Sequence, residues 1–199
     1  MKVTDNIFYK ASEWITRFAF LNILWLIFSL AGLVVFSFFP STMAMFSVLR
    51  KWIMGDRDIP IFRTFWKYFK TEFISSNLMG VIILLISFTV YLNLKYIDHT
   101  SSNELQFFHV PIYVVMISLI LTILYLFPTY THYKLNFLNY FKRAFIIMFT
   151  NPVANLLMIV SLFISYSIMS VIPVIFLVFG GSITAYIIMR FCYNTFQKV

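Results

Sequence analysis

The chain has 199 residues, of which 61% are hydrophobic and only 11% are charged, and its formal net charge is +8. So few charged side chains cannot cover the surface of a water-soluble globule, which excludes that class of protein. The basic residues lie between long apolar segments, so we exclude nucleic acid as a partner and assign their charge to contact with the lipid bilayer and its anionic headgroups.

The first apolar segment is too long for one membrane crossing and too short for two. It is uncharged from Phe18 to Leu49, which is 32 residues, whereas one crossing takes about 20. We therefore expect a first span over 18–39, followed by an interfacial helix over 41–53. Pro40 suits the start of that helix, because a residue in the first turn needs no N–H partner. Before the span, an apolar stripe at helical spacing predicts an interfacial helix over 4–16.

The segment from Ile61 to Ile74 has the clearest helical pattern in the chain. At about 100° per residue, its aromatic side chains form one stripe and its basic side chains cluster beside that stripe. The aromatic residues are Phe62, Phe65, Trp66, Phe69 and Phe73, and the basic residues are Arg63, Lys67 and Lys70. This composition is typical of a helix in the headgroup region, so we predict an interfacial helix over 61–75.

The second half of the chain holds the strongest membrane signal. From Ala144 to Met189, 46 consecutive residues include no Asp, Glu, Lys or Arg, and Pro152 and Pro173 interrupt the run. Lipid offers no partner for unpaired backbone groups, so the crossing segments must be helices. The sequence therefore predicts an all-α, polytopic transmembrane helix bundle that forms a single domain over residues 1–199. About five spans are expected, over 18–39, 77–95, 110–132, 152–170 and 173–190, with a further interfacial helix over 134–149.

The basic residues orient these spans. Six of them lie between 40 and 76, three lie between 133 and 151, and none lies between 96 and 109. The positive-inside rule therefore places residues 40–76, residues 133–151 and the C-terminus in the cytoplasm, and the 96–109 loop outside. Five crossings then place the N-terminus outside, with 11 basic residues inside and four outside. If the first segment is re-entrant instead, 14 basic residues lie inside and one lies outside.

An internal repeat favours five crossings. Tyr68-Phe69-Lys70 and Tyr140-Phe141-Lys142 share a Tyr-Phe-Lys-x-x-Phe spacing, and Phe-Pro pairs precede them at 39–40 and 127–128. A span, a Phe-Pro pair, a basic helix and another span thus recur in parallel, as repeats do in many membrane bundles. On this interpretation the first and third spans run in the same direction, and the N-terminus is outside.

The sequence carries no motif of an enzyme. There is no phosphate-binding glycine loop, no Gly-x-Ser-x-Gly elbow and no His-Glu-x-x-His pair, and Cys192 is the only cysteine. We therefore expect no enzymatic activity, no cofactor and no metal site. The polar residues of the spans include Asn22, Asn93, Ser118 and Thr122, which either join helices or line a solute path.

Four short motifs lie in the first 75 residues. They are Asn22-Ile23-Leu24-Trp25-Leu26, Phe39-Pro40-Ser41-Thr42-Met43-Ala44, Val48-Leu49-Arg50-Lys51-Trp52 and Phe65-Trp66-Lys67-Tyr68-Phe69-Lys70. Together they resemble the YesL-like family of bacterial integral membrane proteins, a domain of unknown function. Phe39 departs from the family pattern, which has a glycine before this proline. The resemblance implies a multi-pass protein of the bacterial plasma membrane and supplies no catalytic residues. Members are often encoded beside carbohydrate uptake genes, which implies a link to carbohydrate transport.

Three functions are compatible with the sequence. The first is an accessory protein that binds carbohydrate transporter subunits through its cytoplasmic face. The second is a small permease or channel for a neutral solute, and the third is a lipid-binding or structural membrane protein. The residues that we expect to contact a partner or anionic headgroups are Arg50, Lys51, Trp52, Arg63, Trp66, Lys67 and Lys70.

Overall fold

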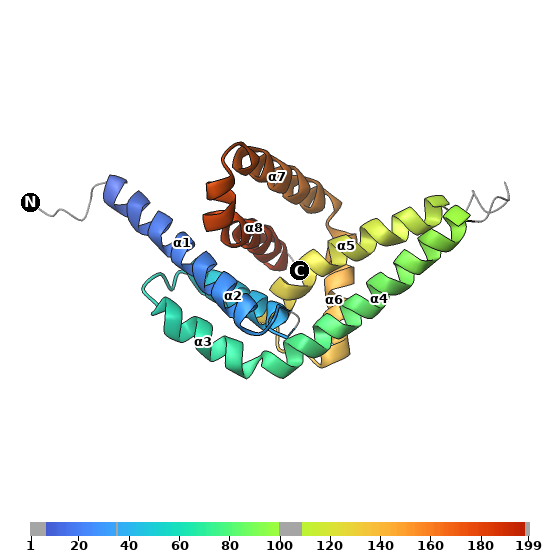
Figure 1. Ribbon diagram of the computed structural model, residues 1–199, viewed down its shortest axis with the longest axis horizontal. Helices are drawn as coiled ribbons and strands as arrows, with labels where there is room; N and C mark the ends of the chain where they lie inside the picture. The colour runs from blue at the N-terminus through green and yellow to red at the C-terminus, as the bar shows by residue number, and fades with distance from the viewer. Residues whose placement is uncertain (1–6, 35, 100–108, 198–199) are drawn as a thin grey trace, which may run out of the picture.

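The structure, a computed structural model, describes residues 7–34, 36–99 and 109–197. These residues form eight α-helices and no strand, which confirms the all-α prediction (Figure 1). Five of the helices, α1, α4, α5, α7 and α8, are long and apolar enough to cross a membrane. The helices are α1 (Ile7–Ala31), α2 (Phe38–Ile53), α3 (Ile61–Thr71), α4 (Phe73–His99), α5 (His109–His132), α6 (Phe137–Thr150), α7 (Pro152–Val171) and α8 (Pro173–Phe196).

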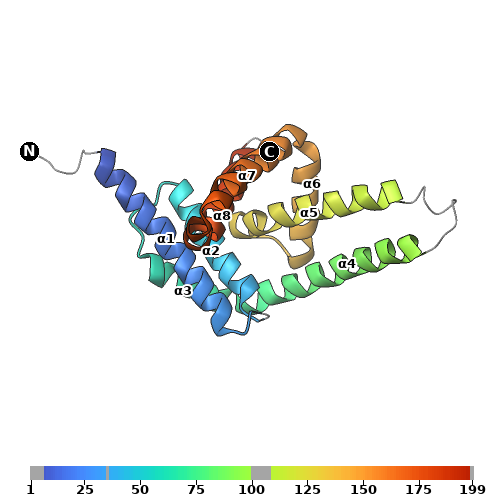
Figure 2. The same cartoon turned by 45° about the horizontal axis from the view of Figure 1, so that its top comes forward.

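The helices form three hairpins. α4 and α5 lie side by side and project from the body of the molecule, and α7 and α8 are joined by a turn at Ile172 (Figures 1 and 2). α1 pairs with the shorter α2, since Trp25 donates to Thr42 at 3.1 Å and Trp14 packs edge-on against Trp52. The short helices α3 and α6 connect one hairpin to the next. Most of the predicted outer loop, residues 100–108, lies outside the described residues.

α1 is one continuous helix from Ile7 to Ala31, whereas we predicted a separate interfacial helix and a span that continued to residue 39. The chain then turns back through Leu33 and Val34, whose φ angles are 55° and 64°. This left-handed backbone is costly for branched side chains. Hydrogen bonds from the Val34 N–H to the Ser29 carbonyl and from the Phe38 N–H to the Val34 carbonyl hold the turn.

α2 is the central helix of the molecule. Every residue from Pro40 to Leu49 is buried, and α1, α3, α4, α5 and α8 pack around it. We predicted an interfacial helix over 41–53, but a helix in the interface exposes one face to the headgroups, and this helix forms the core instead. Small side chains such as Ser41, Ala44 and Ser47 allow the neighbouring helices to approach closely, which is how helices associate within lipid.

The turn between α1 and α2 packs against the beginning of α4. The Asn77 side-chain amide donates to the Phe36 carbonyl at 2.9 Å, and the Phe39 ring lies against Gly80. Gly80 is only about 10 Å along an α4 helix that is roughly 40 Å long. The α1–α2 hairpin therefore reaches only the first part of α4.

The predicted repeat coincides with α3 and α6, and each of these helices is followed at once by a long helix. The two Phe-Pro pairs are not equivalent, because Phe39-Pro40 opens α2 whereas Pro128 lies inside α5. The helices that precede α3 and α6 are α2 and α5, which pack together with Phe46 stacked on Phe127 at 5.7 Å. Within the repeat, α5 therefore corresponds to α2 and not to α1. The repeat then gives no reason to expect that α1 and α5, the first and third predicted spans, run in the same direction.

Candidate functional site

The basic helix α3 is attached to the body of the molecule by its aromatic stripe. Thr64, Phe65 and Phe69 are buried. The ring of Phe28 on α1 lies 5.3 Å from Phe65 and 5.1 Å from Phe69 between ring centroids. Aromatic pairs in such tilted arrangements stabilise the contact beyond simple burial. One face of α3 is therefore fixed, and the other face is presented outward.

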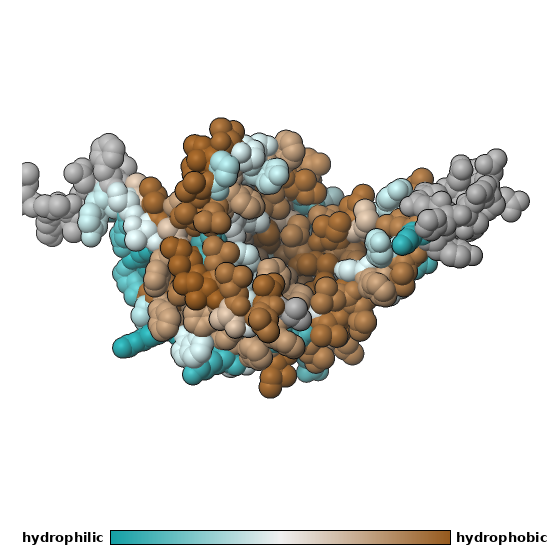
Figure 3. All heavy atoms as spheres, viewed as in Figure 1, coloured by the Kyte–Doolittle hydropathy of each residue, from teal (hydrophilic) through white to brown (hydrophobic). Residues whose placement is uncertain are grey.

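The outward face of α3 is basic and aromatic. Arg63, Lys67 and Lys70 are exposed, as are Phe62 and Trp66. The Lys70 ammonium lies 4.3 Å above the Trp66 ring, a cation–π geometry. In the space-filling view, hydrophilic atoms gather on the side of the molecule where α3 and the preceding loop lie, whereas hydrophobic atoms cover α4 and α5 (Figure 3). We call Phe62, Arg63, Trp66, Lys67 and Lys70 the α3 surface.

No basic side chain of the α3 surface has an acidic partner within the part of the chain that the structure describes. The ion pairs found there both involve Arg17, which contacts Glu13 and Asp58. The charge of Arg63, Lys67 and Lys70 is therefore not neutralised by the described residues. A concentrated positive potential of this kind attracts an acidic surface.

The structure separates the other predicted contact residues from the α3 surface. Trp52 is only 3% exposed, because Trp14 and Phe18 pack edge-on against its ring, so it belongs to the core. Arg50 and Lys51 are half-buried in the last turn of α2. Of the seven residues, Arg63, Trp66, Lys67 and Lys70 form one accessible surface, and Trp52 is a structural residue.

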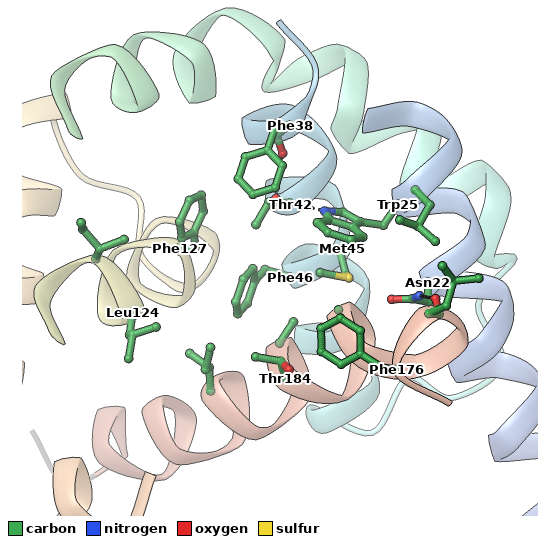
Figure 4. Close-up of a pocket in the computed structure, with 17 residues that line it drawn as sticks. Asn22, Trp25, Phe38, Thr42, Met45, Phe46, Leu124, Phe127, Phe176 and Thr184 are labelled. Carbon is green, nitrogen blue, oxygen red and sulfur yellow. Dashed lines mark hydrogen bonds between the residues drawn. The ribbon is translucent and has the colours of Figure 1, made fainter. Parts of the chain in front are cut away.

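A second feature, which the sequence did not predict, is a cavity of about 510 Å³ between α1, α2, α5 and α8 (Figure 4). Aromatic side chains from all four helices line it: Trp25, Phe38, Phe46, Phe127 and Phe176. Gly180 and Gly181 form part of its wall, so the backbone of α8 lies close to the cavity. Of the polar residues that the sequence analysis named, Asn22 lies in this wall, opposite Gly181.

The polar groups in the cavity wall are largely bonded to the protein itself. Asn22 is 1% exposed; its amide donates to the Leu177 carbonyl at 2.8 Å, and its Oδ1 accepts from the Ser182 N–H at 2.9 Å. The Trp25 indole N–H donates to Thr42, whose hydroxyl donates to the Phe38 carbonyl at 2.7 Å. Thr184 on α8 also lines the cavity, is exposed and makes no hydrogen bond to another described residue. Apart from this hydroxyl, the wall offers mainly carbon to whatever occupies the cavity.

The polar residues proposed for a solute path do not converge. Asn22 lines the cavity, but Asn93 is exposed on α4 and donates to the Thr89 carbonyl of its own helix. On α5, Ser118 and Thr122 also donate to carbonyls one turn earlier. Hydrogen bonds of this kind satisfy a hydroxyl or amide locally within a membrane helix. These four side chains therefore do not form a continuous polar lining.

These features define the protein as a helical, multi-pass membrane protein with an apolar interior and a basic surface helix. A family model described as protein of unknown function, DUF624, matches residues 18–94. Three proteins of Bacillus subtilis (strain 168) are similar over most of their length. The uncharacterized protein YteU is 34% identical over 94% of this chain and 84% of its own length. The uncharacterized protein YesL is 32% identical, over 94% and 88% of the two chains.

A third relative, the uncharacterized protein YesV, is 33% identical over 98% of this chain and 94% of its own length. The chain therefore belongs to the DUF624 family, which confirms the resemblance to YesL-like proteins. The family match includes all four motifs between residues 22 and 70. No solved structure matches the chain.

Proposed function

We propose that this protein is a non-catalytic accessory component of a carbohydrate transporter in the bacterial plasma membrane. α3, α6 and the C-terminus face the cytoplasm, and the α3 surface is where the partner binds. The observation that supports this proposal most directly is the state of Arg63, Lys67 and Lys70. They are exposed on a helix whose opposite face is buried, and none has an ion-pair partner among the described residues.

The composition of the α3 surface fits a protein partner. Trp66 and Arg63 are of residue types that are enriched where proteins bind one another. Lysine is depleted from the centres of such interfaces, so Lys67 and Lys70 are assigned to the polar rim. Charge complementarity speeds the encounter and rejects partners of the same sign. Because the buried face of α3 is fixed against Phe28, binding does not have to order the helix first. The expected partner surface is acidic with an apolar centre.

The class of partner that we propose rests on the resemblance to the YesL-like family. YesL-like proteins are often encoded beside carbohydrate uptake genes, so a transporter subunit is the partner that we propose. The alternative of a permease for a neutral solute has less support, because Asn93, Ser118 and Thr122 bond within their own helices. An anionic headgroup on the α3 surface is the remaining alternative, and the experiment below separates it from a protein partner.

Affinity purification from native membranes in mild detergent, with quantitative mass spectrometry of proteins and lipids, tests the proposal. The test variant replaces Arg63, Lys67 and Lys70 with Gln. The control variant replaces Lys134, Lys142 and Arg190 with Gln, because these three residues are also exposed and the change in charge is the same. If each contact contributes about 0.5 kcal/mol, recovery of the transporter subunit falls roughly tenfold for the test variant.

The control variant should recover the transporter subunit as the unaltered protein does. Equal recovery from the test variant, or no transporter subunit with the unaltered protein, overturns the proposal. A loss of co-purified anionic lipid in the test variant, without any transporter subunit in either sample, assigns the α3 surface to headgroups instead.

A further inference from the structure

We propose that the cavity between α1, α2, α5 and α8 is a binding site for one hydrocarbon chain of a membrane lipid. This site is separate from the α3 surface, and the inference does not depend on the proposed accessory function. It rests on the depth of the cavity in the membrane, its size and the bonding of its polar groups.

The cavity lies at membrane depth. Three of the four helices that form it, α1, α5 and α8, are long and apolar enough to cross a bilayer. The residues that line the cavity lie within these candidate spans, in the C-terminal halves of α1 and α5 and in the first two-thirds of α8. Exposed apolar side chains, Phe176 and Leu177, stand at its wall. In the view of Figure 3 the surface between α1, α5 and α8 is hollowed, and hydrophobic atoms surround the hollow. The cavity therefore opens toward the hydrocarbon chains of the bilayer.

The size of the cavity selects a thin occupant. Its volume is about 510 Å³. One turn of a helix about 10 Å wide and 5.4 Å long fills about 420 Å³, and a crossing helix has more than five turns. The cavity therefore holds little more than one turn of a partner helix. A single alkyl chain is thin enough to enter it.

The bonding of the wall selects an apolar occupant. Asn22 already makes two hydrogen bonds to α8, and Trp25 and Thr42 bond to one another and to the Phe38 carbonyl. The Thr184 hydroxyl is the remaining polar side-chain group of the wall, so a sugar that entered would leave most of its hydroxyl groups without partners, at a cost of about 1–3 kcal/mol each. A lipid chain loses no hydrogen bond and no apolar surroundings on leaving the bilayer, and the dispersion contacts that it makes with the wall offset the ordering of the chain.

Photocrosslinking of the purified, full-length protein in phosphatidylglycerol vesicles tests this site. One probe is a phospholipid with a diazirine at the end of its acyl chain, and the second carries the diazirine on its headgroup. Phe46 is the reporter residue, because it lines the cavity but is only 4% exposed. Leu85 on α4 is 61% exposed and reports on ordinary surrounding lipid. The acyl-chain probe should modify both residues, and the headgroup probe should leave Phe46 unmodified.

Two variants fill the cavity from different positions, Thr184→Trp and Leu177→Trp. Each should lower modification of Phe46 roughly fivefold or more, because close packing leaves no room for the chain, and should leave Leu85 unchanged. Ser167→Trp is the control, since Ser167 is an exposed hydroxyl residue in the candidate span of α7, does not line the cavity and lies on a different helix from Leu85. Circular dichroism shows which variants fold. One folded filling variant is enough to carry out the test.

Three outcomes overturn the inference. The first is a Phe46 that the acyl-chain probe does not modify above the level seen without irradiation. The second is modification of Phe46 that persists in a folded filling variant. The third is modification of Phe46 by the headgroup probe, which assigns the cavity to a polar ligand.

Discussion

Arg17 in α1 donates a hydrogen bond to Asp58 at 3.1 Å, although the two residues are 41 positions apart. Asp58 belongs to the loop between α2 and α3, and Arg17 also bonds to the carbonyl of Arg57 in that loop. Glu13, one turn earlier in α1, contacts the same guanidinium at 2.5 Å. The N-terminal half of α1 and the loop between α2 and α3 therefore lie at the same depth. The hairpin that joins them turns back beside Gly80, near the start of α4.

This relationship predicts that the α1–α2 hairpin enters and leaves the bilayer on one side. Single cysteines at Ser12, Asp58 and Lys95, in a protein whose Cys192 is replaced by Ser, report the topology through a membrane-impermeant thiol reagent. In intact cells we expect labelling at position 95 and protection at positions 12 and 58. Inverted vesicles should give the opposite pattern. Labelling at position 12 in cells where position 58 is protected contradicts the re-entrant hairpin and restores five crossings with the N-terminus outside.

The sequence predicts the long helices well because charge-free length is a local property. The helices α4, α5, α7 and α8 each contain the span predicted for them, since lipid forces every apolar segment of that length into helix. The first segment is different, because its uncharged run of 32 residues is compatible with one long span or with a short hairpin. The contact of Phe36 and Phe39 with Asn77 and Gly80 decides between these, and no local pattern encodes that contact.

The candidate functional site also has one part that the sequence predicts and another part that it does not. The α3 surface is predictable, because a helical stripe places Phe65 and Phe69 inside and Lys67 outside whatever the rest of the fold. Trp52 and the cavity are not predictable. The burial of Trp52 depends on Trp14 and Phe18 from another helix, and the cavity exists only where four helices meet. Properties that arise from packing between distant segments require the assembled fold.

Asn22 joins α1 to α8, so its replacement should destabilise the bundle. Asn22→Leu removes the bonds to the Leu177 carbonyl and the Ser182 N–H and leaves those groups facing an apolar side chain. Hydrogen bonds between membrane helices contribute about 0.6–1.7 kcal/mol, so we expect a loss of unfolding free energy within about this range per bond. Thermal unfolding in detergent measures it. Asn93→Leu is the control, because Asn93 is exposed and bonds only to its own helix; equal effects of the two changes refute the bridging role of Asn22.

Gly80 allows the α1–α2 hairpin to pack on α4. A Cβ atom at this position would lie 2.2 Å from the Phe39 ring, so Gly80→Ala should lower the unfolding free energy by about 1–3 kcal/mol through overpacking. Gly180→Ala is the matched change in α8, where the nearest atom is 3.3 Å away on the exposed Phe176 ring. That variant should be neutral or gain up to about 1 kcal/mol from reduced backbone freedom in the unfolded chain. If both alanines are tolerated equally, Phe39 does not rest against Gly80 in the membrane.

The two tryptophans that the sequence grouped as contact residues should respond differently to truncation. Trp52 is 3% exposed between Trp14 and Phe18, so Trp52→Ala leaves a large void and should cost about 3–5 kcal/mol of unfolding free energy. Trp66 is 36% exposed on the α3 surface, and its ring also packs against Phe28 and Phe69, so Trp66→Ala should cost about 1–2 kcal/mol, less than the loss of Trp52. Thermal unfolding in detergent measures both, and co-purification from native membranes supplies the second readout. Trp66→Ala should reduce recovery of the transporter subunit while the protein remains folded. Trp52→Ala, where it remains folded at low temperature, should recover the subunit normally; a selective loss of binding in that variant would return Trp52 to the contact surface.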